Sequence, residues 1–211
     1  SQAINNTSAQ INLMDSYGRP TETGVNMTFT DSKTGKEIAN MYHTLNDRDV
    51  PDTIYMDPGY LYDIKVHTIP PVYKRKVEII AGRHNTIAID APQGLLSLKI
   101  DGVTNYKNLQ AIIIDKQSGE IIQVQDFNEQ QKYIVNDYKV ELLTLPRITQ
   151  ESVQVEQNKT TTLQVQQPGK LNVVTRKKLE MGIYYRHNGE LELIKNIYNV
   201  NGQDITVLQP G

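Results

Sequence analysis

The chain lacks cysteine and tryptophan, and it holds only two phenylalanines among its 211 residues. Without cysteine, neither a disulfide framework nor a thiolate metal site can form. Hydrophobic residues make up 38% of the sequence, a supply that suits small β-sandwiches with thin cores better than one large globule. The length and composition therefore predict two or three small domains.

The sequence also has no excess of charge of either sign and no long apolar run. Its 22 basic and 24 acidic residues give a formal net charge of -2, which offers no electrostatic reason to expect nucleic acid or an anionic membrane as a partner. The basic clusters Lys74–Lys76 and Arg176–Lys178 lie where loops meet strands, and we interpret them as solvated turns. No run approaches the roughly 18 apolar residues that a transmembrane segment needs.

No leader sequence is recognisable at Ser1, which is compatible with a cytosolic protein or with the processed part of an exported one. The composition, which is rich in Asn, Gln and Thr, favours export. We therefore expect a secreted, periplasmic or cell-surface location.

What the sequence does contain is a tandem repeat. When it is shifted by 76 positions without a gap, the stretch that begins at Tyr62 meets Tyr138 to Val174. The identical residues that then coincide include Tyr62 with Tyr138, Thr68 with Thr144, Pro70 with Pro146, Val77 with Val153, Pro92 with Pro168 and Leu95 with Leu171. A repeat of this length is typical of a structural unit copied in tandem.

Short segments of alternating apolar and polar residues, separated by turn residues, fill each repeat. Residues 62–66 alternate in this way, as half-buried strands do. Residues 31–38 and 115–122 form the same predicted hairpin at an offset of 84, each with a glycine for the positive φ of a tight turn. Residues 40–52 form the longest connection without an alternating pattern. The two offsets, 76 and 84, differ because part of this connection is missing from the second repeat, and loops tolerate such deletions where strands do not. No segment has a convincing helical period.

The predicted fold is therefore all-β, with tandem antiparallel sandwiches of about seven strands each. We expect a flexible lead-in over 1–8, a first unit over 9–92, a second over 93–168, and a truncated third over 169–211. In the third unit we expect short strands at 171–174 and 181–185, and the last three strands of the plan are missing. Such a unit has open edges, so it should be the least stable part or should borrow pairing from elsewhere.

No residue pattern predicts a catalytic, cofactor-binding or metal-binding residue, or an enzyme. None of the four histidines, His43, His67, His84 and His187, has a partner at a metal-ligand spacing, and we expect all four at the surface. The acidic segment 46–52 resembles half a calcium loop, but it lacks the glycine and the terminal glutamate of an EF-hand, and calcium binding there stays open.

The sequence bears on two further kinds of site. An internal isopeptide bond from Lys99 is excluded, because the partner strand over 160–166 has no asparagine. The twelve tyrosines are candidates for binding sugar rings. Tyr62 and Tyr138 occupy equivalent inward positions, which favours a role in the core. The unassigned candidates are Tyr55, Tyr60, Tyr73, Tyr184, Tyr185 and Tyr198.

The phrases "MDPGYLYDIKV" and "VEIIAGRHNTIAI" resemble the carboxypeptidase-regulatory, or prealbumin-like, sandwich family. The phrases "YHTLNDRDVPDT", "VHTIPPV" and "NYKNLQAII" look like the C-terminal β-region of exported bacterial proteins with an upstream von Willebrand factor A domain. The metal-binding Asp-x-Ser-x-Ser motif of that domain is absent from this sequence. The resemblance implies a module beside such a domain at the cell envelope.

The sequence thus favours a non-enzymatic, extracytoplasmic scaffold, spacer or adhesion-associated module without a cofactor, since copied sandwiches make semi-rigid spacers. Its expected partner is a protein or the upstream von Willebrand factor A domain. The alternative is a module that binds a carbohydrate or a peptide through exposed tyrosines. An enzyme would need a pocket with convergent titratable groups, which the scattered histidines and carboxylates disfavour.

Overall fold

The computed structural model describes residues 6–102, 106 and 108–210, and in this part of the chain the regular structure is entirely β-strand. None of it forms a helix long and apolar enough to cross a membrane. The prediction of an all-β fold is confirmed. The strands are β1 (Ser8–Met14), β2 (Val25–Asp31), β3 (Glu37–His43), β4 (Leu61–Val66), β5 (Val72–Glu78), β6 (His84–Asp90), β7 (Gln93–Ile100), β8 (Gln110–Asp115), β9 (Ile121–Asp126), β10 (Gln130–Ile134), β11 (Asn136–Leu142), β12 (Ile148–Val155), β13 (Thr160–Val165), β14 (Gly169–His187) and β15 (Glu190–Leu208).

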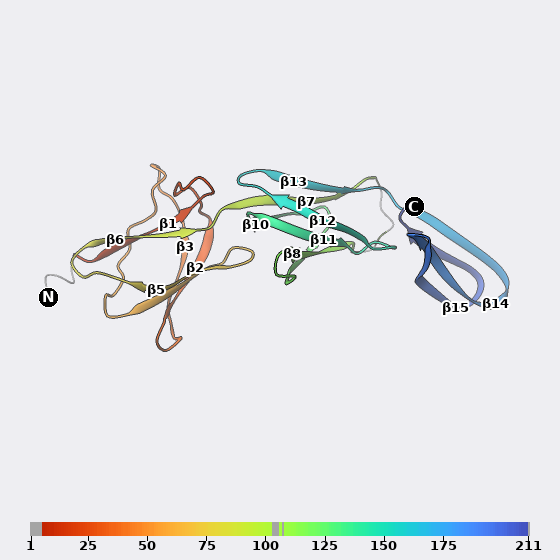
Figure 1. Ribbon diagram of the computed structural model, residues 1–211, viewed down its shortest axis with the longest axis horizontal. Coiled ribbons are helices and arrows are strands. Elements are labelled where there is room, and N and C mark those ends of the chain that lie inside the picture. The colour runs from red at the N-terminus through yellow and green to blue at the C-terminus, as the bar shows by residue number, and fades with distance from the viewer. Residues whose placement is uncertain (1–5, 103–105, 107, 211) are drawn as a thin grey trace. The chain divides into compact units, whose positions relative to one another are not determined.

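The first repeat is a sandwich of two sheets (Figure 1). One sheet is antiparallel, with the strand order β3-β2-β4-β5, and the other pairs β1 with β6. β1 and β6 run parallel, which sets Ile11 beside Ile87 and Leu13 beside Ile89. Alternate residues of β1 are buried because successive side chains of a strand point to opposite faces of the sheet.

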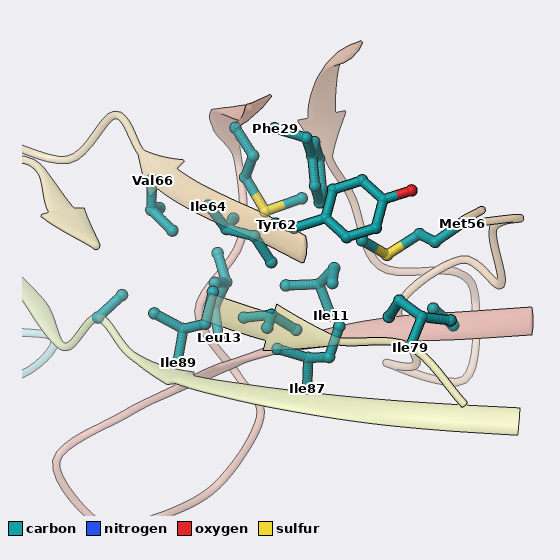
Figure 2. Packing of buried hydrophobic residues seen from close by; sticks show 14 of the residues in the cluster. Ile11, Leu13, Phe29, Met56, Tyr62, Ile64, Val66, Ile79, Ile87 and Ile89 are labelled. Carbon is teal, nitrogen blue, oxygen red and sulfur yellow. The ribbon is translucent and has the colours of Figure 1, made fainter. Parts of the chain in front are cut away.

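The core of this sandwich lies between the two sheets. Figure 2 shows aliphatic side chains of the smaller sheet facing Phe29, Tyr62 and Ile64 of the larger one. Tyr62 lies edge-on to Phe29, with ring centroids 6.5 Å apart. Burying each large apolar side chain contributes about 1.5–3 kcal/mol, so alternation alone is a strong determinant of which face turns inward. The inward placement of Tyr62 and of its equivalent Tyr138 is confirmed.

The second repeat follows the same strand plan. Its sheets have the orders β12-β11-β8-β9 and β10-β7-β13, so β8 is a central strand. Gly35 and Gly119 occupy equivalent turns with φ of 73° and 75°.

The loops of the two repeats also match. Pro70 and Pro146 both follow cis peptide bonds. The Thr68 hydroxyl donates to the Pro70 carbonyl at 2.8 Å, and the Thr144 hydroxyl donates to the Pro146 carbonyl at 2.7 Å. The sequence repeat therefore extends to local backbone geometry.

The predicted start of the long connection was wrong. β3 extends to His43, so residues 40–43 belong to a strand and not to the long connection. Farther along the same connection, Ile54 forms one bridge with Ala9. Residues 1–5 of the predicted lead-in lie outside the described part, but Thr7 is buried and its hydroxyl accepts the Gly82 N–H at 2.8 Å.

The third repeat is a hairpin of two 19-residue strands, β14 and β15, where short strands were expected. Register shifts interrupt it between Thr175 and Leu179 and again beyond Leu179. Lys195 Nζ lies 2.8 Å from Thr206 Oγ1, although the two residues are 11 positions apart on β15. A straight strand would separate them by about 36 Å, so the hairpin is bent at the register shifts. The segments predicted as separate strands, 171–174 and 181–185, lie on either side of this bend.

By packing, the chain divides into two compact units. Unit 1 holds residues 1–96, 132–136 and 154–161, and unit 2 holds the remainder. The ends of several strands of the second repeat therefore belong to unit 1 together with the first repeat. The domain boundaries predicted from the repeat stay a prediction, because repetition and packing divide the chain by different criteria.

Candidate functional site

The structure places the four histidines in four separate environments. His67 Nε2 lies 2.6 Å from Thr28 Oγ1, and His84 Nδ1 lies 2.9 Å from Ser8 Oγ, both on exposed surface. The ring of His187 lies 5.6 Å from that of Tyr185 near the hairpin turn. Within the described residues, no three His, Asp or Glu side chains converge as a metal site would require.

His43 corrects the expectation of surface histidines, since it is buried, with 4% of its surface exposed. Its Nε2 donates to the Ile11 carbonyl at 2.8 Å, and its Nδ1 lies 3.1 Å from Thr23 Oγ1. The ring therefore links β3 of one sheet to β1 of the other. This role was missed because residues 40–43 were assigned to a loop, where no inward face was expected.

The acidic segment 46–52 is organised by its own backbone. Asn46 Oδ1 accepts the N–H groups of Arg48 at 2.9 Å and Val50 at 3.2 Å. Leu45 and Pro51 form a bridge that closes the loop. The Asn46 side chain thus serves the turn, as an Asx turn does.

The basic residues and Lys99 lie on the surface. Lys74–Lys76 is exposed, and the Arg75 guanidinium lies 3.3 Å from the Asp63 carboxylate and 4.6 Å from the centre of the Tyr73 ring. Arg176–Lys178 is exposed at the bend of β14, and Lys99 is also exposed. Exposed pairs of this kind contribute little to stability.

An aromatic groove opens on the side of the first sandwich between β3 and the segment 54–60. Its volume is about 310 Å³. The floor is apolar and includes Met41 and Ile54, while the exposed rings of Tyr55 (58%) and Tyr60 (42%) stand at its rim. This volume and lining fit a small ligand or a few sugar rings.

Tyr62 forms the inner wall of the groove, and Figure 2 shows its hydroxyl directed away from the packed core. The hydroxyl donates to the Asp57 carbonyl at 2.9 Å, and the Tyr60 ring lies 5.9 Å from the Tyr62 ring. Burial, and then the negative charge of Asp57, raise the pKa of Tyr62 to about 12. The phenol is therefore a neutral donor that fixes the segment 57–60 under the rim.

The second notable cluster surrounds Glu22, a buried carboxylate at the junction between the first and second repeats, inside unit 1. Gln93 donates to it through its backbone N–H at 3.4 Å and through Nε2 at 3.2 Å. Gln157 Nε2 also donates to Glu22, and Gln157 Oε1 accepts the Ser16 N–H at 3.2 Å. Amide donors thus replace water around a charge that would otherwise be costly to bury.

The backbone around this cluster is equally close. Leu95 N–H donates to the Lys159 carbonyl at 2.8 Å, and Val135 N–H donates to the Pro92 carbonyl at 2.8 Å. A side chain added at Gly94 would place its Cβ 2.0 Å from the Glu156 carbonyl oxygen. Only glycine allows the two backbones to approach so closely.

The loop that presents Ser16 to Gln157 is held by Asp15. The Asp15 carboxylate accepts the N–H groups of Tyr17 at 2.8 Å and Arg19 at 2.9 Å, and the Thr21 hydroxyl at 2.7 Å. Burial alone would raise the pKa of Asp15, but the hydrogen bonds from Arg19, Thr21 and Tyr17 outweigh it and lower the pKa to about 2.

The solved structures with weak similarity to the chain include two bacterial proteins. One is the Bacillus anthracis TIE protein, with 15% identity and a TM-score of 0.31 over 97% of this chain and 44% of that chain. The other is a Streptococcal ancillary pilin, with 9% identity and a TM-score of 0.32 over 97% of this chain and 87% of that chain. The chain thus spans less than half the length of the TIE protein.

Similarity at these TM-scores carries no argument about the fold or the function of this chain. No protein-family model matches the sequence, and no curated protein matches it either.

Asp15→Asn should make unit 1 less sensitive to acid. The folded pKa of about 2 lies below the ordinary value of 3.8, so this carboxylate stabilises the fold above about pH 4, and the contribution is lost as the pH falls toward 2. In urea unfolding at several pH values from 5 to 2, the midpoint of the wild type should fall more steeply below pH 4 than that of the variant. Asp47→Asn, in the exposed loop, is the matched control and should follow the wild type. Equal slopes for Asp15→Asn and the wild type would contradict the role of Asp15.

Proposed function

We propose that this chain is a non-enzymatic extracytoplasmic scaffold, in which β-sandwich repeats hold a neighbouring binding domain at a set distance and orientation. The partner is a protein domain, and a von Willebrand factor A domain in the same polypeptide is the candidate from the resemblance of the sequence. The location that goes with this function is the cell surface or another extracytoplasmic site.

The observation that carries the proposal is the junction around Glu22. A spacer works only if its repeats do not swing freely, and flexible linkers between domains allow relative motion by default. Here two residues, Ala91 and Pro92, separate β6 from β7, and the first residues of β7 are bonded to Glu22 and Lys159 inside unit 1. A junction with buried, charge-assisted hydrogen bonds supports a fixed connection.

The dispersed histidines agree with a structural role. A hydrolase or lyase needs a base, an acid and an electrophilic group within reach of one another. The histidines of this chain instead lie apart, and each contacts only its own neighbours. His43 links two sheets, and His67 and His84 each lie beside a single hydroxyl on the surface.

The scaffold proposal predicts a narrow distribution of distances between the first repeat and the strand ends of the second repeat that belong to unit 1. Because the chain has no cysteine, Lys33→Cys and Gln154→Cys, both at exposed positions of unit 1, allow clean spin labelling. Pulsed electron–electron double resonance should give one narrow distance peak. Glu22→Ala should broaden this peak, because each buried amide that is left without a hydrogen-bond partner costs about 1–3 kcal/mol of stability. Glu78→Ala, an exposed glutamate, is the control and should leave the peak unchanged. A broad peak before the Glu22 substitution would contradict a fixed spacer.

The aromatic groove supports a second candidate function for the same chain, the binding of a glycan or a peptide by the first repeat. Its two rim tyrosines are exposed while its floor is apolar, which is the arrangement that sugar rings and extended peptides contact. A scaffold that also binds a surface ligand needs no catalytic group.

If the groove binds sugars, neutral soluble oligosaccharides should shift the backbone amide resonances of residues 54–60. The combined change Tyr55→Ala and Tyr60→Ala should weaken binding by ~5-fold or more, since each aromatic contact contributes about 0.5–1.5 kcal/mol. Tyr17→Ala removes an exposed tyrosine outside the groove and should have no effect. Shifts elsewhere on the chain, or binding that the rim variants leave unchanged, would exclude the groove as the site.

A further inference from the structure

The strand that borders the aromatic groove, β3, is an outer strand of its sheet. In the part of the chain that the structure describes, β3 pairs with β2 alone. The His67 N–H donates to the Asn26 carbonyl at 2.9 Å, so the polar backbone groups of Asn26 point to β4 and those of the next residue, Met27, point to β3. The residue of β3 that pairs with Met27 therefore bonds to β2. The N–H and C=O groups of its two neighbours, Asn40 and Tyr42, point away from β2.

The two outer strands of this sheet differ in how they are protected. β5, at the other edge, carries the exposed basic run Lys74–Lys76. Charged side chains on an edge strand, lysine above all, oppose pairing with a further strand. β3 contains no lysine, arginine or proline. The edge of β3 is therefore open to an extended peptide, which can add to a sheet as one more strand.

A hollow follows this unprotected edge. Ile38 and Met41 of β3 line the aromatic groove, and a smaller hollow of about 90 Å³ lies beside it. The two hollows share Met41 and Ile54, and the smaller one reaches Tyr42 and Thr44 at the end of β3. Successive side chains of a strand point to opposite faces of its sheet. Every second side chain of a peptide paired with β3 would thus point into this hollow.

The aromatic groove favours a positive charge. Asp57 lines it, is exposed, and forms no ion pair with the residues that the structure describes. Apart from burial, the groups that raise the pKa of the Tyr62 phenol are Asp57 and the two rim tyrosines, so all of them act at one place. Surroundings that disfavour a negative phenolate favour a cation, and the faces of tyrosine rings attract one as well.

The chain does not supply this cation itself. Among the described residues that line the two hollows there is no lysine or arginine. Asp52 adds a second carboxylate, in the smaller hollow. The charge of the hollow is therefore complementary to a basic ligand.

We propose that the groove binds an extended peptide of a partner protein, which pairs with the free edge of β3 and places a lysine or arginine side chain between Tyr55 and Tyr60, beside Asp57. This inference rests on the groove as a binding site and names its occupant. A sugar has no backbone that could pair with the N–H and C=O groups of Asn40 and Tyr42. Backbone pairing supplies the affinity, and the rings with the carboxylate supply the preference for a basic side chain.

The probe is a peptide of about seven residues with blocked ends, in which valine and threonine alternate and one lysine replaces the central valine. Added to the full chain, it should shift the amide resonances of Asn40 and Tyr42 together with those of residues 54–60. Norleucine in place of the lysine keeps the apolar stem and should weaken binding by ~5-fold or more, because the cation is lost. Methylation of all amide nitrogens of the peptide should weaken binding by ~10-fold or more, because the peptide then has no donor for β3.

Asp57→Asn tests the charge in the protein. Asparagine keeps an oxygen that can accept the Gly59 N–H, which Asp57 Oδ1 accepts at 2.8 Å. The preference for the lysine peptide over the norleucine peptide should fall by about threefold, while the norleucine peptide binds as before. Asp47→Asn removes an exposed charge that lines neither hollow, and this matched control should leave the preference unchanged.

Equal binding of the lysine and norleucine peptides, or a methylated peptide that binds as tightly as the original, would overturn the inference. A lysine peptide that does not bind at ~1 mM would do so too. If a neutral oligosaccharide then still shifts residues 54–60, the groove is a binding site with a different occupant. If neither probe binds, the groove is no binding site at all. The scaffold proposal is independent of each of these outcomes.

Discussion

A buried carboxylate at the junction of the two complete repeats is the constraint on which the architecture of unit 1 depends. Glu22 lies among the amides of Gln93 and Gln157, and it forms no ion pair with the residues that the structure describes. A buried charge is tolerated only while its hydrogen bonds are complete. The start of β7 and the turn between β12 and β13 must therefore stay where Gln93 and Gln157 reach Glu22. This requirement explains why the ends of second-repeat strands pack with the first repeat.

The two complete repeats use one strand plan. In the first two repeats, β2 and β8 are paired on both sides, which leaves their sheets closed to further strands at that position. Such closed units suit a spacer. Among the described residues, β14 and β15 form a two-stranded sheet that carries exposed apolar residues.

Much of the fold could be predicted from the sequence because its determinants are local. Alternation placed Tyr62 and Tyr138 in the core, and the glycines at 35 and 119 marked the hairpins. The junction could not be predicted, because Glu22 and Gln157 are 135 positions apart and neither has a local signature. His43 was missed for a similar reason, since its partner Ile11 lies on a strand of the other sheet. The tyrosines of the groove were candidates by residue type, but only the fold shows that Tyr55 and Tyr60 share a rim.

The most direct test of the central claim is a double-mutant cycle of unfolding free energies for Glu22→Ala and Gln157→Ala, measured singly and together in urea. If the junction depends on the bond between these side chains, the two changes are non-additive, with a coupling of about 1.5 kcal/mol or more. Each single change should then be nearly as damaging as both together. Additive effects, with a coupling within about 0.5 kcal/mol of zero, would contradict the account, because the buried carboxylate would then not hold the second repeat to the first.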